Sequence, residues 1–177
     1  MNLKNTPEHY GFITKSFHWV IAFCMILMIF LGFFMHPLMH VTGIDIRWIH
    51  KALGLTLLLL GILFNLWRIF TKKPPYLSSM KRWEEIAATA SHHSLLTLII
   101  LMPLSGLIMS SYAGHLPSFW GLFTVGLPVT INPQIAHTFG EIHEILGIIL
   151  SAVIVIHLLA VIRHHFFLKD NTLGRMR

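Results

Sequence analysis

The sequence has little of what water-soluble proteins carry on their surfaces: only 11% of its 177 residues are charged, and only 7 are acidic. It has a single cysteine, Cys24, which excludes a disulfide within the chain and the two-cysteine motif that attaches a c-type haem. No low-complexity tract or Gly/Ser linker divides the chain, so a single domain over residues 1–177 is expected. With 55% hydrophobic residues and a mean hydropathy of +0.70, the composition predicts a membrane protein.

Four segments are apolar and long enough to cross a bilayer, which takes about 20 residues. They are residues 17–36, 48–70, 86–112 and 142–162. Pro103, inside the third segment, is expected to bend a helix rather than end it. The first segment resembles a signal peptide, but no small-residue cleavage site follows it, so we expect it to be retained. The predicted fold class is an all-α membrane protein, a bundle of four transmembrane helices.

The distribution of positive charge predicts the orientation of this bundle. Of the 13 lysines and arginines, all but Arg47 and Lys51 lie in the N-terminal segment, the second connection or the C-terminal tail. Because basic residues are enriched on the cytoplasmic side, both termini are expected to be cytoplasmic. The high isoelectric point, about 9.8, therefore reflects topology, and a nucleic-acid partner is not expected.

Thirteen histidines are unusual in so apolar a chain, because an imidazole needs polar partners that hydrocarbon does not supply. His143 and His157 lie on the fourth segment, about 21 Å apart along a helix and roughly 40° apart around it. This segment therefore presents one outer and one inner imidazole to the bundle interior. At the outer depth the available partner is His50.

At the inner depth the available partner is His18, and His92 and His93 are alternatives to it. Four such imidazoles without a cysteine pair suit bis-histidine iron in a porphyrin better than zinc or calcium. For any one histidine taken alone, interhelical hydrogen bonding is the competing interpretation. Stacked planar cofactors, each held between two helices, would use all four histidines.

A glycine follows each outer histidine by four residues, Gly54 after His50 and Gly147 after His143. Residues four apart share a helix face, and a residue without a side chain lets a flat macrocycle approach the backbone. The two glycines are therefore predicted to contribute to cofactor binding.

Several motifs together make the chain similar to the bacterial cytochrome b561 family: FHW at 17–19, HKALG at 50–54, HEILG at 143–147 and the tail HHFFLKDNTLGRM at 164–176. The resemblance implies two non-covalent b haems in the bundle core, in a multi-pass protein of the bacterial inner membrane. It implies axial ligation of the outer haem iron by His50 and His143, and of the inner haem iron by His18 and His157.

The resemblance also implies ubiquinone chemistry on the cytoplasmic side, where His164 matches a family histidine near the quinone and His92 is a second candidate. One branch of the family oxidises superoxide to O2 and passes the electron to ubiquinone. On that interpretation, Arg47 and Lys51 would attract the anion to the outer face. No residue is predicted to be catalytic in any other sense.

Two other functions remain open at this stage. The chain could be a haem-bearing relay and membrane anchor for a periplasmic dehydrogenase or hydrogenase, which requires a redox partner protein. It could also be a histidine-lined transporter without a cofactor, which a haem spectrum would exclude. For electron transfer from superoxide to ubiquinone, the expected partners are membrane lipid, a quinone and a small diffusible donor.

Overall fold

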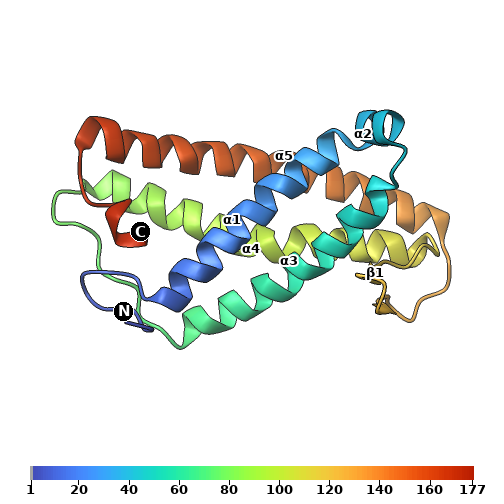
Figure 1. Ribbon diagram of the computed structural model, residues 1–177, viewed down its shortest axis with the longest axis horizontal. Coiled ribbons are helices and arrows are strands. Elements are labelled where there is room, and N and C mark those ends of the chain that lie inside the picture. The colour runs from blue at the N-terminus through green and yellow to red at the C-terminus, as the bar shows by residue number, and fades with distance from the viewer. Residues whose placement is uncertain (1) are drawn as a thin grey trace.

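The computed structural model describes residues 2–177, which form an elongated bundle of helices (Figure 1). Its long helices are α1 (Phe12–Phe33), α3 (Ile46–Ile69), α4 (Arg82–Tyr112) and α5 (Pro133–Ile162). The shorter elements are α2 (Met35–Thr42), strands β1 (Ser118–Phe119) and β2 (Phe123–Thr124), the π-helix η1 (Arg163–Leu168) and the 3-10 helix η2 (Gly174–Met176). The four long helices, with α5 continued by η1, are each long and apolar enough to span a membrane, as predicted.

The helices differ from the predicted segments at their ends. α5 begins at Pro133 rather than near residue 142, because Asn132 accepts hydrogen bonds from the N–H groups of Gln134 and Ile135. Proline is tolerated in the first turn, where its missing N–H has no partner to lose. His143 therefore lies well inside α5 rather than at its start. Pro103 lies inside α4 and does not end it.

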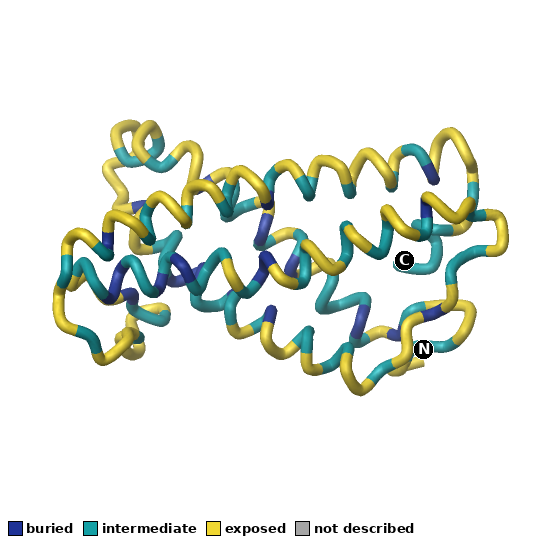
Figure 2. Tube along the Cα trace, turned by 180° about the vertical axis from the view of Figure 1, so that it is seen from behind, coloured by how far each residue is buried: buried dark blue, intermediate teal, exposed yellow. Residues whose placement is uncertain are grey.

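Close backbone packing joins α1 to α3, α3 to α4 and α4 to α5. Within residues 2–177, neither α1 nor α3 packs extensively on α5. The main apolar core lies at mid-bundle and is formed by Ile21, Met25, Leu57, Leu98, Ile99 and Leu150. Figure 2 shows exposed residues along the outer faces of all the long helices, which in a bilayer are the faces that meet lipid.

Both termini lie at one end of the bundle, which we call the terminal end (Figure 1). Arg175 ties this end together, because its guanidinium donates hydrogen bonds to the carbonyls of Pro7, Glu8 and Pro75. One side chain thus joins the C-terminal tail, the N-terminal segment and the α3–α4 connection. Together with the helix ends next to them, these three segments carry eleven of the 13 basic residues.

The opposite end, the hairpin end, carries α2, the start of α3 and the β1–β2 hairpin of the α4–α5 connection. Trp120 lies in the turn of this hairpin with φ +51°, a left-handed conformation that is uncommon for a residue with a side chain. Its indole N–H donates to Thr56 Oγ1 at 2.8 Å, and its ring packs edge-on against Trp48. These contacts hold the hairpin along α3 and offset the backbone strain.

Candidate functional site

Two imidazoles from different helices face each other near the hairpin end. The ring centroids of His50 on α3 and His143 on α5 lie 6.2 Å apart, with an interplanar angle of 77°. Because α3 and α5 do not pack extensively on each other, this pair bridges a wide helix separation. The structure therefore brings together the two residues that sequence depth suggested for the outer site.

Helix α4 orients His143. Its Nδ1 lies 3.0 Å from the Met102 carbonyl oxygen and 3.0 Å from Ser105 Oγ. An N–H at Nδ1 that donates to this carbonyl leaves Nε2 with a free lone pair, the form that binds a metal. Gly106 supplies the space for the ring, because a Cβ there would lie 2.9 Å from His143 Cε1.

Sequence reasoning missed Met102, Ser105 and Gly106 as parts of the site. The only signal in the sequence is that two small residues, Ser105 and Gly106, follow Pro103 closely. This pattern does not predict a contact with His143, nearly forty positions away.

A second group of imidazoles lies deeper in the bundle, toward the terminal end. The ring centroids of His18 on α1 and His157 on α5 are 6.5 Å apart. His92 on α4 lies on another side of His157, with centroids 5.6 Å apart. His93 is exposed on the outer face of α4 and bonds through Nδ1 to the Thr89 carbonyl. The structure therefore keeps His92 at the inner site and places His93 outside it.

The separations within the two pairs fit imidazoles that share one metal. A metal–imidazole nitrogen bond of about 2 Å, with the nitrogen about 1.2 Å from the ring centre, puts two opposed rings about 6.3 Å apart. The His50–His143 and His18–His157 pairs are close to this value, whereas the His92–His157 separation is shorter. The geometry thus favours His18 over His92 as the partner of His157.

The chemistry of these residues also fits a porphyrin-bound iron. Within residues 2–177, no group of three or more His, Cys, Asp or Glu residues could hold a metal ion without further ligands. Two imidazoles suffice when a macrocycle supplies the remaining nitrogens. In addition, Nδ1 of His18 and Nδ1 of His50 are buried without a hydrogen-bond partner. A buried polar atom without a partner costs free energy, so both rings are sites where a further bound group could lower that cost.

The two predicted glycines have side-chain neighbours that can move. A Cβ on Gly54 would lie 3.5 Å from the terminal methyl of Met28, and one on Gly147 would lie 3.3 Å from the terminal methyl of Met102. Methionine is unbranched and flexible, so these methyl groups can yield to a bound planar group. A role for Gly54 and Gly147 beside a haem stays a prediction.

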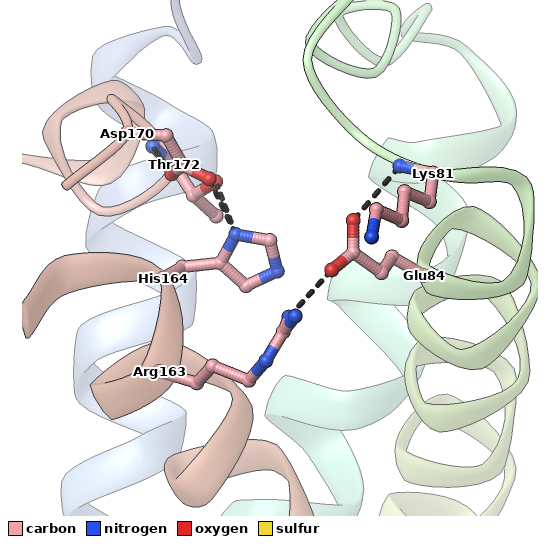
Figure 3. A network of polar contacts seen from close by, with 6 residues as sticks. All are labelled: Lys81, Glu84, Arg163, His164, Asp170 and Thr172. Carbon is pink, nitrogen blue, oxygen red and sulfur yellow. Dashed lines mark hydrogen bonds and ion pairs between the residues drawn. The ribbon is translucent and has the colours of Figure 1, made fainter. Parts of the chain in front are cut away.

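At the terminal end, His164 lies in η1 directly after α5 and is buried. The tail folds back on it, so that Nδ1 of His164 lies 2.5 Å from Asp170 Oδ2 and 3.5 Å from Thr172 Oγ1 (Figure 3). Burial alone would raise the pKa of Asp170, but hydrogen bonds from Thr172 and His164 outweigh it and lower that pKa. Asp170 is therefore a carboxylate that accepts from Nδ1, which leaves Nε2 of His164 for another partner.

An ion pair between a half-exposed arginine and a buried carboxylate lies beside His164. Arg163 donates to Glu84 Oε1 at 2.5 Å, and the other oxygen of this carboxylate accepts from the backbone N–H of Lys81 (Figure 3). Glu84 is only 5% exposed, so removing its partner would leave a buried charge. The pair fixes the end of α5 to the start of α4. Sequence reasoning singled out neither Glu84 nor Asp170, because each acts through a residue distant in the chain or across a turn.

The two basic residues of the hairpin end differ in their surroundings. Arg47 forms an exposed ion pair with Asp45 at 3.0 Å, which offsets part of its charge. Lys51 follows His50, is half-buried, and donates to the His115 carbonyl oxygen at 2.9 Å. A carbonyl leaves the charge of the ammonium in place, so Lys51 contributes more positive potential near His50 than Arg47 does.

Comparisons with known proteins show which family the chain resembles. A family model described as prokaryotic cytochrome b561 matches residues 9–177. Cytochrome b561 homolog 2 of Escherichia coli (strain K12) is 34% identical, over 99% of this chain and 95% of that protein. Cytochrome b561 homolog 1 of the same organism is 37% identical over 53% of each chain. A protein of Yersinia pestis named probable superoxide oxidase CybB is 30% identical over 73% of each chain.

Proposed function

Because the chain belongs to the prokaryotic cytochrome b561 family, a family of multi-pass electron-transfer proteins of the bacterial inner membrane, we propose that it carries single electrons from periplasmic superoxide to ubiquinone through two b haems. The observation that carries the proposal is the two facing imidazole pairs, His50–His143 and His18–His157, held at different depths by the continuous helix α5. Bound haem supplies one-electron redox chemistry at each pair.

The protein's own residues would prepare the outer site for haem. The Met102 carbonyl and Ser105 fix the tautomer and direction of the His143 ring, so Nε2 faces the interior. Gly106 leaves room for the ring. His50 would bind from α3 on the opposite side. We assign the hairpin end to the periplasm and the terminal end to the cytoplasm, because the terminal end carries nearly all the positive charge.

Superoxide is favoured as the donor by two features. One relative carries the name probable superoxide oxidase, and the hairpin end exposes positive charge beside His50. Lys51 would raise the local concentration of an approaching anion. Each superoxide loses one electron and leaves as O2, and two such electrons with two cytoplasmic protons convert one ubiquinone to ubiquinol.

The quinone would bind at the terminal end, near His164. Asp170 holds Nδ1 of His164, so Nε2 can exchange a proton with a quinone oxygen. The ion pair of Arg163 with the buried Glu84 would fix the wall on the α4 side. His92, whose ring lies beside that of His157, is a second candidate for quinone contact.

The test uses purified protein in mild detergent, a superoxide-generating system and a soluble ubiquinone analogue. We expect superoxide to reduce the haems, and ubiquinol to form only when protein, superoxide and quinone are all present. Haems that stay oxidised in superoxide would reject the donor. Haems that are reduced but not reoxidised by quinone would reject the acceptor. A stable periplasmic redox subunit that co-purifies and reduces the haems would favour a relay and anchor function instead.

A further inference from the structure

A pocket of about 480 Å³ opens at the terminal end of α4, away from the paired histidines and from His164. Its wall is formed by the first three turns of α4 together with Tyr76 of the α3–α4 connection. None of the residues assigned above to haem or quinone lines this pocket.

One side of the pocket wall is polar. The Tyr76 hydroxyl lies 2.7 Å from Thr89 Oγ1 and accepts a hydrogen bond from Lys73 Nζ at 3.0 Å. Lys73 also lies over the Tyr76 ring, 4.1 Å from its centroid. On the α4 side, Arg82 is highly exposed and forms a weak surface pair with Glu85 at 3.3 Å. Two cations from different segments therefore flank the pocket entrance.

The charge around this entrance is positive. Lys72, Lys73, Lys81 and Arg82 lie within eleven residues of the chain. The nearby carboxylates are already engaged, since Glu84 pairs with Arg163 and Glu85 pairs with Arg82. An anion at the entrance would thus meet uncompensated lysine charge.

The other side of the pocket wall is apolar and lies on the outer face of a membrane-spanning helix. Ile86 and Ala90 line it and are exposed, and His93 closes it about 16 Å along α4 from Arg82. The exposed Trp83 lies at the height of the entrance, where amphipathic aromatic rings prefer the membrane interface. The pocket therefore combines a cationic entrance at Arg82 with a wall that is polar on one side, at Tyr76 and Thr89, and apolar on the other, at Ile86 and Ala90.

We propose that this pocket binds an anionic phospholipid of the cytoplasmic leaflet. The phosphate lies between Arg82 and Lys73, the Tyr76 hydroxyl and Thr89 form the polar wall, and the first part of an acyl chain lies along Ile86 and Ala90. The proposal is independent of the donor and quinone assignments and rests only on the terminal end facing the cytoplasm. Charge complementarity selects the occupant, since basic clusters next to membrane spans attract anionic lipids.

The experiment is native mass spectrometry of the haem-loaded protein in detergent, titrated with phosphatidylglycerol or phosphatidylethanolamine. We expect one phosphatidylglycerol to bind at least fivefold more tightly than phosphatidylethanolamine. Arg82→Gln and Lys73→Gln should each weaken phosphatidylglycerol binding about fivefold. Glu85→Gln should strengthen it, because it removes a carboxylate from the pocket wall. Ala90→Trp, which fills the apolar side of the pocket without a change of charge, should prevent binding.

The matched control is Lys72→Gln, which removes the same charge one residue from Lys73, the lysine that contacts Tyr76 of the pocket wall. An equal loss in Lys72→Gln and Lys73→Gln, or binding unaffected by Ala90→Trp, would show only diffuse surface attraction and overturn the proposal. So would equal binding of the two lipids, or displacement of phosphatidylglycerol by a ubiquinone analogue at equal concentration. An unchanged haem spectrum in each variant shows that the fold is intact.

Discussion

Gly106 of α4 lies against the imidazole of His143 on α5, so closely that a Cβ at position 106 would come within 2.9 Å of His143 Cε1 and 3.1 Å of Nδ1. The same turn of α4 contributes Ser105, whose Oγ lies 3.0 Å from that Nδ1. One turn of a neighbouring helix therefore sets both the position and the hydrogen bonding of the ring. If His143 is an axial ligand, this turn also sets the geometry of the outer haem.

The first prediction follows from this contact. Gly106→Ala should displace the His143 ring and change the spectrum or lower the occupancy of the outer haem, although alanine favours a helix by about 1 kcal/mol over glycine. Haem content by pyridine haemochrome and low-temperature spectra of the reduced protein measure the effect. The control is Gly140→Ala on α5, where a Cβ meets Met109 Sδ at an ordinary 3.5 Å. Identical spectra for the two variants would contradict the prediction.

The second prediction concerns the number and pairing of the haems. His143→Ala should lower the haem content from two per chain to one, because the His18–His157 pair is formed by other contacts. His92→Ala should keep both haems, since the His92–His157 separation of 5.6 Å is short for a shared metal. The two variants are compared by haem-to-protein ratio. Loss of one haem from His92→Ala, with none lost from His18→Ala, would exchange their roles at the inner site.

The third prediction concerns the tail. Asp170→Asn should slow ubiquinol formation at least tenfold, because an amide no longer holds the Nδ1–H of His164 as a carboxylate does. Reduction of the haems by superoxide should keep its wild-type rate, since this step occurs at the opposite end. Stopped-flow spectroscopy separates haem reduction from haem reoxidation by quinone. Asp170→Glu should restore part of the rate, and equal slowing of both steps would indicate a general structural defect.

The fourth prediction concerns attraction of the anionic donor. Lys51→Gln should lower the second-order rate of haem reduction by superoxide several-fold at low ionic strength, and Arg47→Gln should lower it less, because Asp45 already offsets the charge of Arg47. The difference should shrink as salt is added, since screening weakens long-range attraction. Lys72→Gln, at the other end of the bundle, serves as the control. A loss that does not depend on salt would point to a structural effect of Lys51 on the His115 carbonyl.

Several features of this protein were determined by the sequence alone. Hydropathy is a local property, so four apolar segments predicted four spanning helices, and the distribution of lysine and arginine predicted that the basic segments share one end. The spacing of His143 and His157 is likewise local, because helix geometry alone converts it into two depths on one face. The depth of each histidine in the membrane then limited its possible partners, to one histidine at the outer depth and to three at the inner depth.

The tertiary structure decided what spacing along one helix cannot. At the inner depth His18, His92 and His93 were all available. Only the placement of α1, α4 and α5 relative to one another put His93 on the outer face and His18 at the distance of a shared metal. The contacts of Ser105 and Gly106 with His143 join residues nearly forty positions apart in the chain. The ion pair of Glu84 with Arg163 joins residues almost eighty positions apart. Such contacts leave no periodic signal in either segment, because they depend on how two helices are placed against each other. The sequence therefore determined which groups lie at each depth, and the packing of the helices determined which of them meet.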